Sequence, residues 1–239
     1  MNSVCLALYN GEKYIAEQLK SILSQLGDED EVIVSDDGSA DRSLDIVGSF
    51  GDPRIRVVRN RGERGVNSNF NNALRNARGE YVFLSDQDNV WLPGKVEACL
   101  EALAGCDLVV HDARITDSRL QPLPVTLFEV LHKKEGFLNN LFRNRFSGCC
   151  MAIRREMLRK ALPVPADNAF FYDSWLGMVS ALRGKTAFIP FVGTYMRRHE
   201  GSMSTVGSPS VRSMTARIGG RVKLLKELIN RNIIFERAK

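Results

Sequence analysis

The stretch that decides the fold is Tyr81-Val82-Phe83-Leu84-Ser85-Asp86-Gln87-Asp88-Asn89-Val90-Trp91. It begins with an apolar run that predicts a buried strand, and two carboxylates one residue apart follow. Because Asp and Asn are depleted inside strands, we expect Asp86 and Asp88 just past the strand's C-terminal end. Ligands bind at that edge of open α/β sheets, and a carboxylate pair there suits a hard divalent cation. The alternative is a helix N-cap followed by a turn, which uses the same residue types.

Strands and helices alternate on the N-terminal side of this stretch. The expected strands are 3–8, 31–35, 54–58 and 80–85, and the expected helices are 12–26, one that ends near Phe50, and 66–77. Such alternation with short connections predicts a parallel sheet with right-handed crossovers. The second strand also ends in an acidic pair, Asp36 and Asp37, so two acidic strand ends converge on one edge. No glycine-rich dinucleotide or P-loop motif is present, which disfavours both of those nucleotide-binding classes.

The pattern beyond Trp91 is less regular. We expect a helix from Pro93 to Leu103, a strand over 107–112, and short strands and loop over 113–132. The later expected elements are a helix at 137–142, a strand at 146–153, a helix at 172–182, strands at 186–189 and 194–196, and a mobile Gly/Ser-rich segment at 200–210.

Composition predicts a soluble globular protein in the cytoplasm. Hydrophobic residues make up 44% of the 239 residues and charged residues 26%, and no apolar run reaches the roughly 18 residues of a membrane span. No charged leader precedes an apolar stretch at the N-terminus, so we expect no signal peptide. The five cysteines include no C-x-x-C pair, which favours buried, reduced thiols and no structural zinc.

The excess of basic residues belongs to the C-terminal tail. Residues 211–239 hold eight Lys or Arg against two acids, a net charge of +6, so 1–210 carry −1 of the total of +5. This distribution argues against a nucleic-acid partner for the body. From Ile218 onward, Val222, Leu225, Ile229 and Ile233 recur at helical spacing between basic residues. Such a basic amphipathic helix either binds a membrane surface, making the protein peripheral, or docks on its own domain.

Taken together, residues 1–205 resemble family 2 inverting glycosyltransferases, and in particular the bacterial branch of rhamnosyltransferase-like enzymes that builds O-antigens and capsules. The matching segments are Leu8-Tyr9-Asn10-Gly11-Glu12-Lys13-Tyr14-Ile15, Ser35-Asp36-Asp37-Gly38-Ser39, Ser85-Asp86-Gln87-Asp88 and Tyr195-Met196-Arg197-Arg198-His199. The resemblance implies an α/β fold of the GT-A type, a Rossmann-like mixed sheet flanked by helices. Its nucleotide-sugar half is expected at 1–112 and its acceptor half at 113–205, followed by a linker and basic helix over 206–239.

The resemblance also implies a reaction. The donor is a nucleotide diphosphate sugar, dTDP-rhamnose or a UDP-hexose, and the acceptor is a glycan carried on a lipid in surface polysaccharide synthesis. A Mn²⁺ or Mg²⁺ ion neutralises the leaving diphosphate, and the anomeric configuration is inverted. The alternative from another class is a non-catalytic, nucleotide-binding assembly subunit of a polysaccharide-synthesis complex.

Site residues carry over position by position. Asp88 matches a metal ligand, Asp86 contacts metal or ribose, and His199 completes the metal shell in some relatives. Arg197 and Arg198 can grip the diphosphate bidentately, and plain surface solvation is their alternative. The remaining donor-binding positions are Ala7, Tyr9, Asp36 and Asp37, with Lys13, Arg61 and Arg64 as weaker candidates.

Asp173 matches the catalytic carboxylate that takes the proton from the acceptor hydroxyl. It stands at an expected helix start, where a carboxylate also caps backbone N–H groups. Capping lowers the pKa of such a carboxyl, so apolar neighbours such as Phe171 and Trp175 are needed to offset it. One departure from the branch is Asn89, where relatives commonly carry Asp, and weaker metal binding would follow if that position is a ligand.

Overall fold

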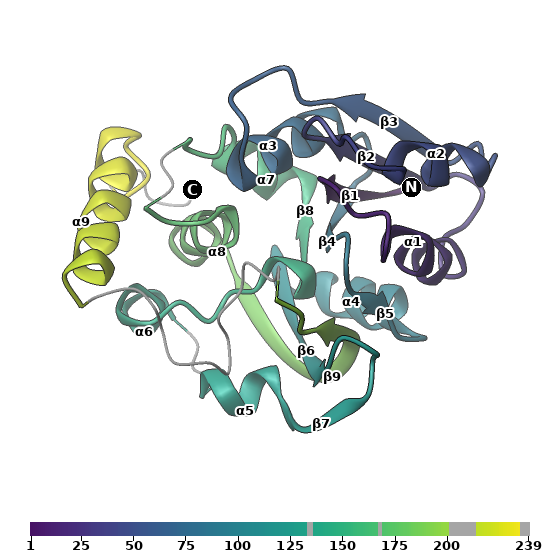
Figure 1. The fold of residues 1–239 in the computed structure, drawn as a ribbon. Coiled ribbons are helices and arrows are strands. Elements are labelled where there is room, and N and C mark those ends of the chain that lie inside the picture. The colour runs from purple at the N-terminus through teal and green to yellow at the C-terminus, as the bar shows by residue number, and fades with distance from the viewer. Residues whose placement is uncertain (133–135, 167–168, 201–213, 235–239) are drawn as a thin grey trace.

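The computed structural model describes residues 1–132, 136–166, 169–200 and 214–234. The first part of the predicted linker and basic helix over 206–239, up to residue 213, and nearly all of the Gly/Ser-rich segment 200–210 lie outside these ranges. All elements below refer to the labels in Figure 1.

Four parallel strands form the N-terminal half of the sheet, in the order β3-β2-β1-β4. Their bounds are β1 Asn2–Leu8, β2 Glu31–Asp36, β3 Ile55–Arg59 and β4 Tyr81–Asp86, and the connecting helices are α1 Ile15–Leu23, α2 Ser43–Ser49 and α3 Val66–Asn76. The chain moves outward from β1 to β3 and then returns to the other side of β1 as β4. This reversal of strand order creates the crevice where α/β sheets bind ligands.

The C-terminal half continues the same sheet with mixed strand directions, β4-β8-β6-β9-β5, and β7 pairs with β6. Its strands are β5 Val90–Trp91, β6 Leu108–Thr116, β7 Pro122–Thr126, β8 Met151–Arg154 and β9 Thr186–Arg197. Its helices are α4 Lys95–Leu103, α5 Leu127–Leu131, α6 Phe137–Phe142, the short 3₁₀ turn Gly148–Cys150, α7 Arg155–Ala161, α8 Tyr172–Arg183 and α9 Met214–Asn230. The mixed sheet flanked by helices confirms the predicted fold class.

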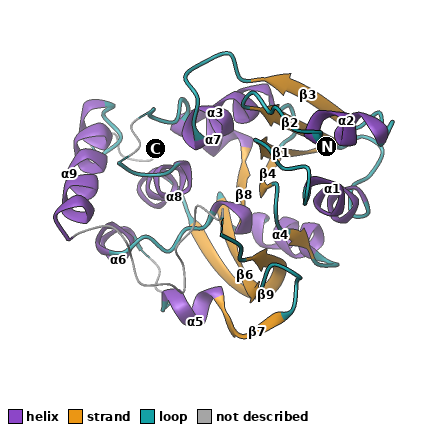
Figure 2. Ribbon diagram, in the orientation of Figure 1, coloured by secondary structure: helices purple, strands orange, loops and turns teal. Residues whose placement is uncertain are grey.

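Two hydrophobic clusters cover the two faces of the sheet. Figure 2 shows helices on both sides of the strands. Val4 and Leu6 of β1 point into the cluster that contains α1 and α4, and Cys5 between them points into the cluster that contains α3 and α8. This alternation is the period of two that a strand imposes on its side chains. All five cysteines are free and buried, as predicted from their apolar settings.

Strand register brings the two acidic strand ends together. Ala7 of β1 pairs with Ser35 of β2 on one side and with Asp86 of β4 on the other. The next residue of β1, Leu8, pairs with Asp36. The convergence predicted from parallel strand ends is therefore confirmed.

The structure differs from the predicted elements in the C-terminal half. The strands expected at 186–189 and 194–196 are one strand, β9, whose register shifts opposite His111–Ala113 absorb the intervening residues as a bulge. The strand expected at 146–153 begins only at Met151, because Gly148 starts a 3₁₀ turn. A Cβ atom at Gly148 would lie 1.8 Å from the Tyr172 hydroxyl oxygen, so glycine is required there. Helix α7 was not predicted, since seven residues are too short for a clear period.

The C-terminal helix is docked on the domain mainly through Leu224 and Leu228, which the predicted apolar face did not include. Leu224 and Leu228 are fully buried and belong to the cluster that also holds Trp175. Of the apolar face that the spacing predicted, Ile218, Val222 and Ile229 are 58%, 45% and 47% exposed, Leu225 is half-buried, and Ile233 is buried in the same cluster as Leu224. The helix thus carries two apolar stripes, and α8 covers only one. None of the helices in the described ranges is long and apolar enough to cross a membrane.

We predict that Leu228→Ala lowers the free energy of unfolding by about 2–5 kcal/mol, because it leaves a cavity in the core. The matched control Val222→Ala, on the outward face of the same helix, changes it by no more than about 0.5 kcal/mol. Urea denaturation of both variants measures this, and equal effects would contradict the docking of α9.

Candidate active site

A group of carboxylates lies at the C-terminal end of β4. The side chain of Asp86 is half-buried, and burial followed by the negative charges of Asp88 and Asp173 raises its pKa to about 7. The Tyr172 hydroxyl donates to Asp86 Oδ1 at 3.3 Å. Three acids from two distant segments, 86–88 and 173, are therefore close enough to repel one another.

His199 reaches this group from the segment after β9. Its Nε2 lies 2.9 Å from Asp88 Oδ2, and its ring lies 4.8 Å from that of Tyr14. In the described part of the chain, no cluster of three or more His, Cys, Asp or Glu side chains is gathered into a preformed metal site. Asp88 and His199 nevertheless form a two-ligand pair beside Asp86. The mutual repulsion at Asp86 fits a cation that would neutralise it, with water and phosphate oxygens as further ligands.

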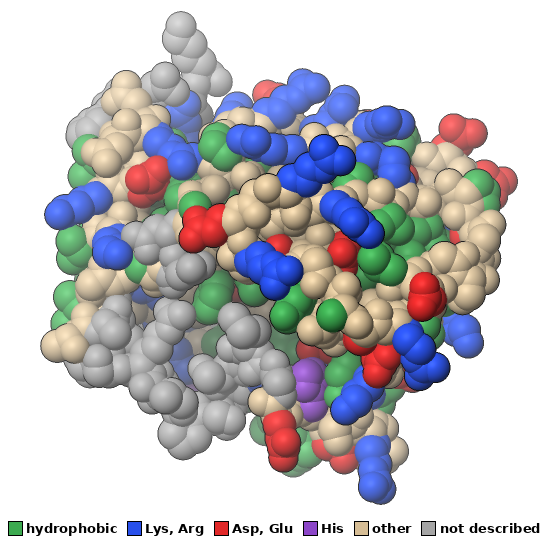
Figure 3. All heavy atoms as spheres, turned by 45° about the horizontal axis from the view of Figure 1, so that its top comes forward, with side chains coloured by type: hydrophobic (Ala, Val, Ile, Leu, Met, Phe, Trp, Pro, Cys, Tyr) green, Lys and Arg blue, Asp and Glu red, His purple; other side chains and the backbone are tan. Residues whose placement is uncertain are grey.

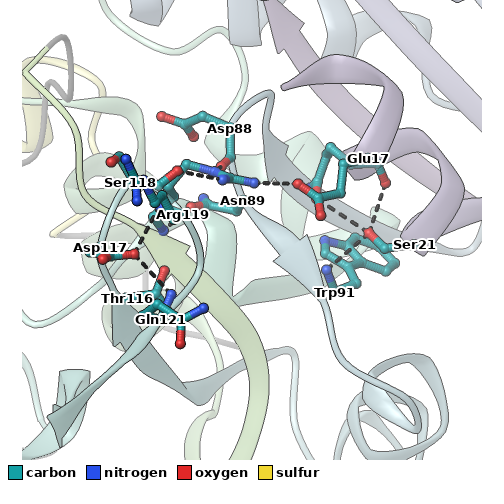
Figure 4. A network of polar contacts seen from close by, with 12 residues as sticks. Glu17, Ser21, Asp88, Asn89, Trp91, Thr116, Asp117, Ser118, Arg119 and Gln121 are labelled. Atoms are coloured by element: carbon teal, nitrogen blue, oxygen red, sulfur yellow. Dashed lines mark hydrogen bonds and ion pairs between the residues drawn. The ribbon is translucent and has the colours of Figure 1, made fainter. Parts of the chain in front are cut away.

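The guanidinium of Arg197, which was predicted to grip the donor, is bonded to protein groups. It donates to the carbonyls of Asp88 and Ser118, each at 2.8 Å, and to Glu17 Oε2 at 2.5 Å. It also lies over the Tyr14 ring, 4.8 Å from its centroid. Figure 4 shows Glu17, Asp88 and Ser118 converging from three different parts of the chain. Arg197 therefore holds the Asp88 loop against α1 and the β6–β7 turn.

Asn89 takes part in the same linkage. Its side chain is buried, and its Oδ1 accepts a hydrogen bond of 3.0 Å from the backbone N–H of Arg197. An aspartate would offer the same acceptor, so the departure at position 89 keeps this link between the residue before β5 and β9.

Arg198 follows Arg197 at the end of β9. It is half-buried, and burial lowers the pKa of its guanidinium while the nearby Asp88 and Cys149 oppose that effect. The charge of Asp88 acts on Arg198, so this guanidinium lies on the side of the carboxylate group.

Asp173 lies in the first turn of α8, half-buried beside the carboxylate group. Burial raises its pKa to about 6, and backbone N–H groups of Ser174 and Gly148 and the charge of Arg221 oppose this rise. The Ser174 N–H donates to Asp173 Oδ1 at 2.5 Å. The effect of burial on the pKa of Asp173 is thus larger than the opposing effect of the backbone N–H groups. A carboxylate with this pKa accepts a proton more readily than an ordinary aspartate and is still ionised at neutral pH.

The start of α8 is positioned by Asn67 on α3, a residue that the sequence did not single out. Asn67 Oδ1 accepts from the Tyr172 N–H at 2.8 Å, and Nδ2 donates to the Phe170 carbonyl at 2.9 Å. The ring of Phe70, one turn along α3, stacks on Tyr172 with 3.7 Å between centroids. Phe171 at the N-cap supplies no side-chain cap, so Asn67 replaces it from another helix. A contact across about a hundred residues has no local sequence signal.

The loop after β1 is tied to the loop after β4 by Gln87. Its Oε1 accepts from the Tyr9 N–H at 2.7 Å, and its Nε2 donates to the Tyr9 carbonyl at 2.9 Å. A Cβ atom at Gly11 would come within 2.7 Å of Gln87, so glycine is needed for this approach. The Tyr9 side chain is left 49% exposed at the edge of the sheet.

A cavity of about 400 Å³ lies at the C-terminal ends of β2 and β3. Its lining residues are Asp36, Gly38, Ser39, Arg59, Asn60 and Arg61. The Asp36 carboxylate accepts from the Gly38 and Ser39 N–H groups, and the Asp37 carboxylate accepts from Asn60 Nδ2 and the Gly65 N–H. Asp36 thus shapes the cavity, whereas Asp37 holds the loop over 60–65.

Lys95 is a buried cation behind the carboxylate group. No sequence pattern had pointed to this residue. Its Nζ donates to the Cys149 carbonyl at 2.8 Å and to Thr194 Oγ1 at 3.1 Å. It also lies 4.0 Å from the centroid of the Trp91 ring. Burial lowers the pKa of Lys95, and its charge lowers that of Asp86. Trp91 and Trp175 are both buried, so they serve packing.

Comparison with known proteins places the chain in a family. Residues 3–162 match the pattern of glycosyl transferase family 2. The chain belongs to this family. It is therefore a glycosyltransferase, as its sequence motifs predicted.

Individual relatives agree with this assignment. The chain is 23% identical to the UDP-Glc:α-D-GlcNAc-diphosphoundecaprenol β-1,3-glucosyltransferase WfgD of Escherichia coli, over 85% of this chain and 79% of the relative. Among solved structures, S. aureus TarS with UDP-GlcNAc gives a TM-score of 0.67 at 21% identity, over 98% of this chain and 73% of that chain. A mannosyltransferase of Pyrobaculum calidifontis with GDP-Man and Mn²⁺ gives 0.61 at 21% identity, over 100% and 65%. These structures confirm the GT-A fold.

We predict that Asp86→Asn stabilises the protein at neutral pH when divalent metal is removed. Folding raises the pKa of this acid from 3.8 to about 7, so the folded state binds more protons between those values and stability falls as pH rises through them. The advantage of the variant over the wild type therefore grows from about pH 4 to pH 7 and levels off above it. Thermal unfolding in EDTA across this range measures the difference, and a constant offset would refute the pKa shift.

Two substitutions at position 89 test whether Asn89 acts as a hydrogen-bond acceptor for the Arg197 N–H or as a metal ligand. Asn89→Asp retains an acceptor for the Arg197 N–H, so folding and metal dependence stay close to those of the wild type. Asn89→Leu leaves that buried N–H without a partner and lowers the free energy of unfolding by about 1–3 kcal/mol. Denaturation curves and metal titrations of the two variants give the comparison, and large metal effects in Asn89→Asp would indicate direct ligation instead.

Proposed function

We propose that the protein is a metal-dependent, inverting glycosyltransferase. It moves a sugar from a nucleotide diphosphate donor, a UDP-hexose or dTDP-rhamnose, to a lipid-linked glycan during surface polysaccharide synthesis. The observation that carries the proposal is the meeting of Asp173 with the Asp86 and Asp88 carboxylates at the switch point of the sheet. Asp173 suits removal of a proton from the acceptor. Asp86 and Asp88 suit a cation that neutralises the charge of the diphosphate.

Asp173 acts as the general base. Its carboxylate accepts the proton of the acceptor hydroxyl as that oxygen bonds to the anomeric carbon from the face opposite the leaving group. The bond between that carbon and the diphosphate oxygen breaks, and the nucleotide diphosphate departs. With a pKa of about 6, Asp173 is ionised at neutral pH. Activity is therefore lost as the pH falls below about 6, where the carboxylate becomes protonated. Asn67 and the Gly148 N–H hold it in position.

Asp88 and His199, with Asp86 beside them, would hold a Mn²⁺ or Mg²⁺ ion. Such an ion supplies charge neutralisation for the departing diphosphate. Mn²⁺ in the Pyrobaculum mannosyltransferase supports this assignment. Arg198 adds a second positive charge on the same side.

The cavity beside Asp36 receives the nucleoside, next to the exposed ring of Tyr9 and to Ala7. Arg61 lines it, and Arg64 lies against Gly38, so two of the three weaker candidates are at this cavity. The name of the Escherichia coli relative supports UDP-glucose as a donor and an acceptor carried on a polyprenyl diphosphate. With an acceptor of that kind, we expect the protein to work at the cytoplasmic face of the membrane.

The test is release of nucleotide diphosphate from a panel of UDP- and dTDP-sugars with a polyprenyl-diphosphate-linked acceptor, in Mn²⁺, Mg²⁺ or EDTA. EDTA and Asp88→Ala abolish turnover. Asp173→Asn lowers kcat by roughly 10²–10⁴-fold, because a neutral amide cannot accept the proton. In the wild type, kcat/KM falls as the pH drops below about 6, the pKa of Asp173.

Asp45→Asn is the matched control, since Asp45 is an exposed carboxylate on α2. It retains wild-type turnover. Full turnover by Asp173→Asn with the correct donor would show that another group is the base, and full activity in EDTA would refute the role of the metal.

A further inference from the structure

Exposed apolar side chains are concentrated at one end of the molecule. In the described ranges, nine large hydrophobic residues are exposed, and five of them are on α6 and α9. These five are Leu138 at 67%, Phe142 at 85%, Ile218 at 58%, Val222 at 45% and Ile229 at 47%. We call them the apolar platform. Helix α6 packs against α8, and α9 meets α8 through Arg221, which bonds to Ser174, and Arg231, which lies over the Trp175 ring. Figure 1 shows α9 to the left of α8 and α6 below it.

The platform residues are aligned along each helix. Leu138 and Phe142 are four residues apart on α6, and Ile218, Val222 and Ile229 are separated by four and seven on α9. Such spacings place side chains on one face of a helix. On α9 the opposite face holds Leu224 and Leu228, which are buried in the core. The outward stripe is therefore a second apolar face that no part of the described domain covers.

Positive charge borders this face. Lys223 and Lys226 of α9 are exposed, and so is Arg143 immediately after α6. The one acid within α9, Glu227, is bonded to Arg231 at 2.6 Å. Figure 3 shows Lys and Arg side chains beside apolar ones along the left edge of the molecule, where α9 lies. An apolar stripe edged with cations matches a bilayer with anionic headgroups.

We infer that the apolar platform is a contact surface for an anionic lipid bilayer. A second copy of the chain fits less well, because a symmetric pairing would bring the same lysines of both copies together. A nucleic acid also fits less well, because its affinity comes mainly from phosphate contacts to Lys and Arg and not from exposed apolar side chains.

The position of α9 gives the surface a function at the active site. Arg221 Nη1 donates to Ser174 Oγ at 3.3 Å, and Ser174 follows the proposed base Asp173. One flank of the helix thus meets the first turn of α8 while another flank faces outward. A bilayer on the platform would present the sugar of a lipid-linked acceptor beside Asp173, and this consequence rests on the proposed function.

The test is co-sedimentation of the full chain with vesicles of phosphatidylcholine alone or mixed with an equal amount of phosphatidylglycerol. The wild type binds the anionic vesicles. The triple variant Ile218→Glu/Val222→Glu/Ile229→Glu loses binding by at least about tenfold, and Lys226→Gln lowers it by about fivefold. Deletion of α9 is avoided because it would uncover the core.

The matched control is Val57→Glu/Leu123→Glu, which changes exposed apolar residues on β3 and β7. It binds vesicles like the wild type. Donor hydrolysis in solution and the unfolding temperature stay at wild-type levels in every variant. Wild-type binding by the triple variant, an equal loss in the control, or dimers of the wild type that dissociate in the triple variant without any vesicle binding would overturn the inference. Vesicle binding without turnover of any donor would refute the proposed function and leave the surface standing.

Discussion

The structure depends on holding Asp86, Asp88 and Asp173 together against their mutual repulsion. Burial and like charge raise the pKa of Asp86 to about 7, and burial raises that of Asp173 to about 6. Both shifts mean that the folded chain disfavours the ionised forms that a metal and an acceptor hydroxyl require. Sites of this kind reduce stability for the sake of function. The surrounding contacts must therefore be strong enough to keep the acids in place.

Those contacts come from elements far apart in the sequence. Arg197 and Asn89 fasten the Asp88 loop to β9, and Gln87 fastens it to the loop after β1. Asn67 fixes the start of α8. Lys95 places a buried positive charge behind the group. Each of these residues is polar and buried or half-buried, and each has hydrogen-bond partners, which is the condition under which such burial is tolerated.

The C-terminal helix connects the site to the outside of the molecule. Its inner face contributes Leu224 and Leu228 to the core, and its flank brings Arg221 to the helix that bears Asp173. Periodicity alone favoured the outer stripe of Val222 and Ile229 as the important face. A helix with two apolar stripes gives two equally good periodic patterns, and only packing against α8 distinguishes them.

Local pattern was enough to determine the parallel half of the sheet, the acidic ends of β2 and β4 and the membership in glycosyl transferase family 2. Strand periodicity and short motifs are properties of neighbouring residues, so they are visible in the sequence. The role of Arg197, the helix cap by Asn67, the buried Lys95 and the bulge that makes β9 one strand were decided only by tertiary structure. Each depends on a partner tens to more than a hundred residues away, and the side-chain types alone do not specify those partners.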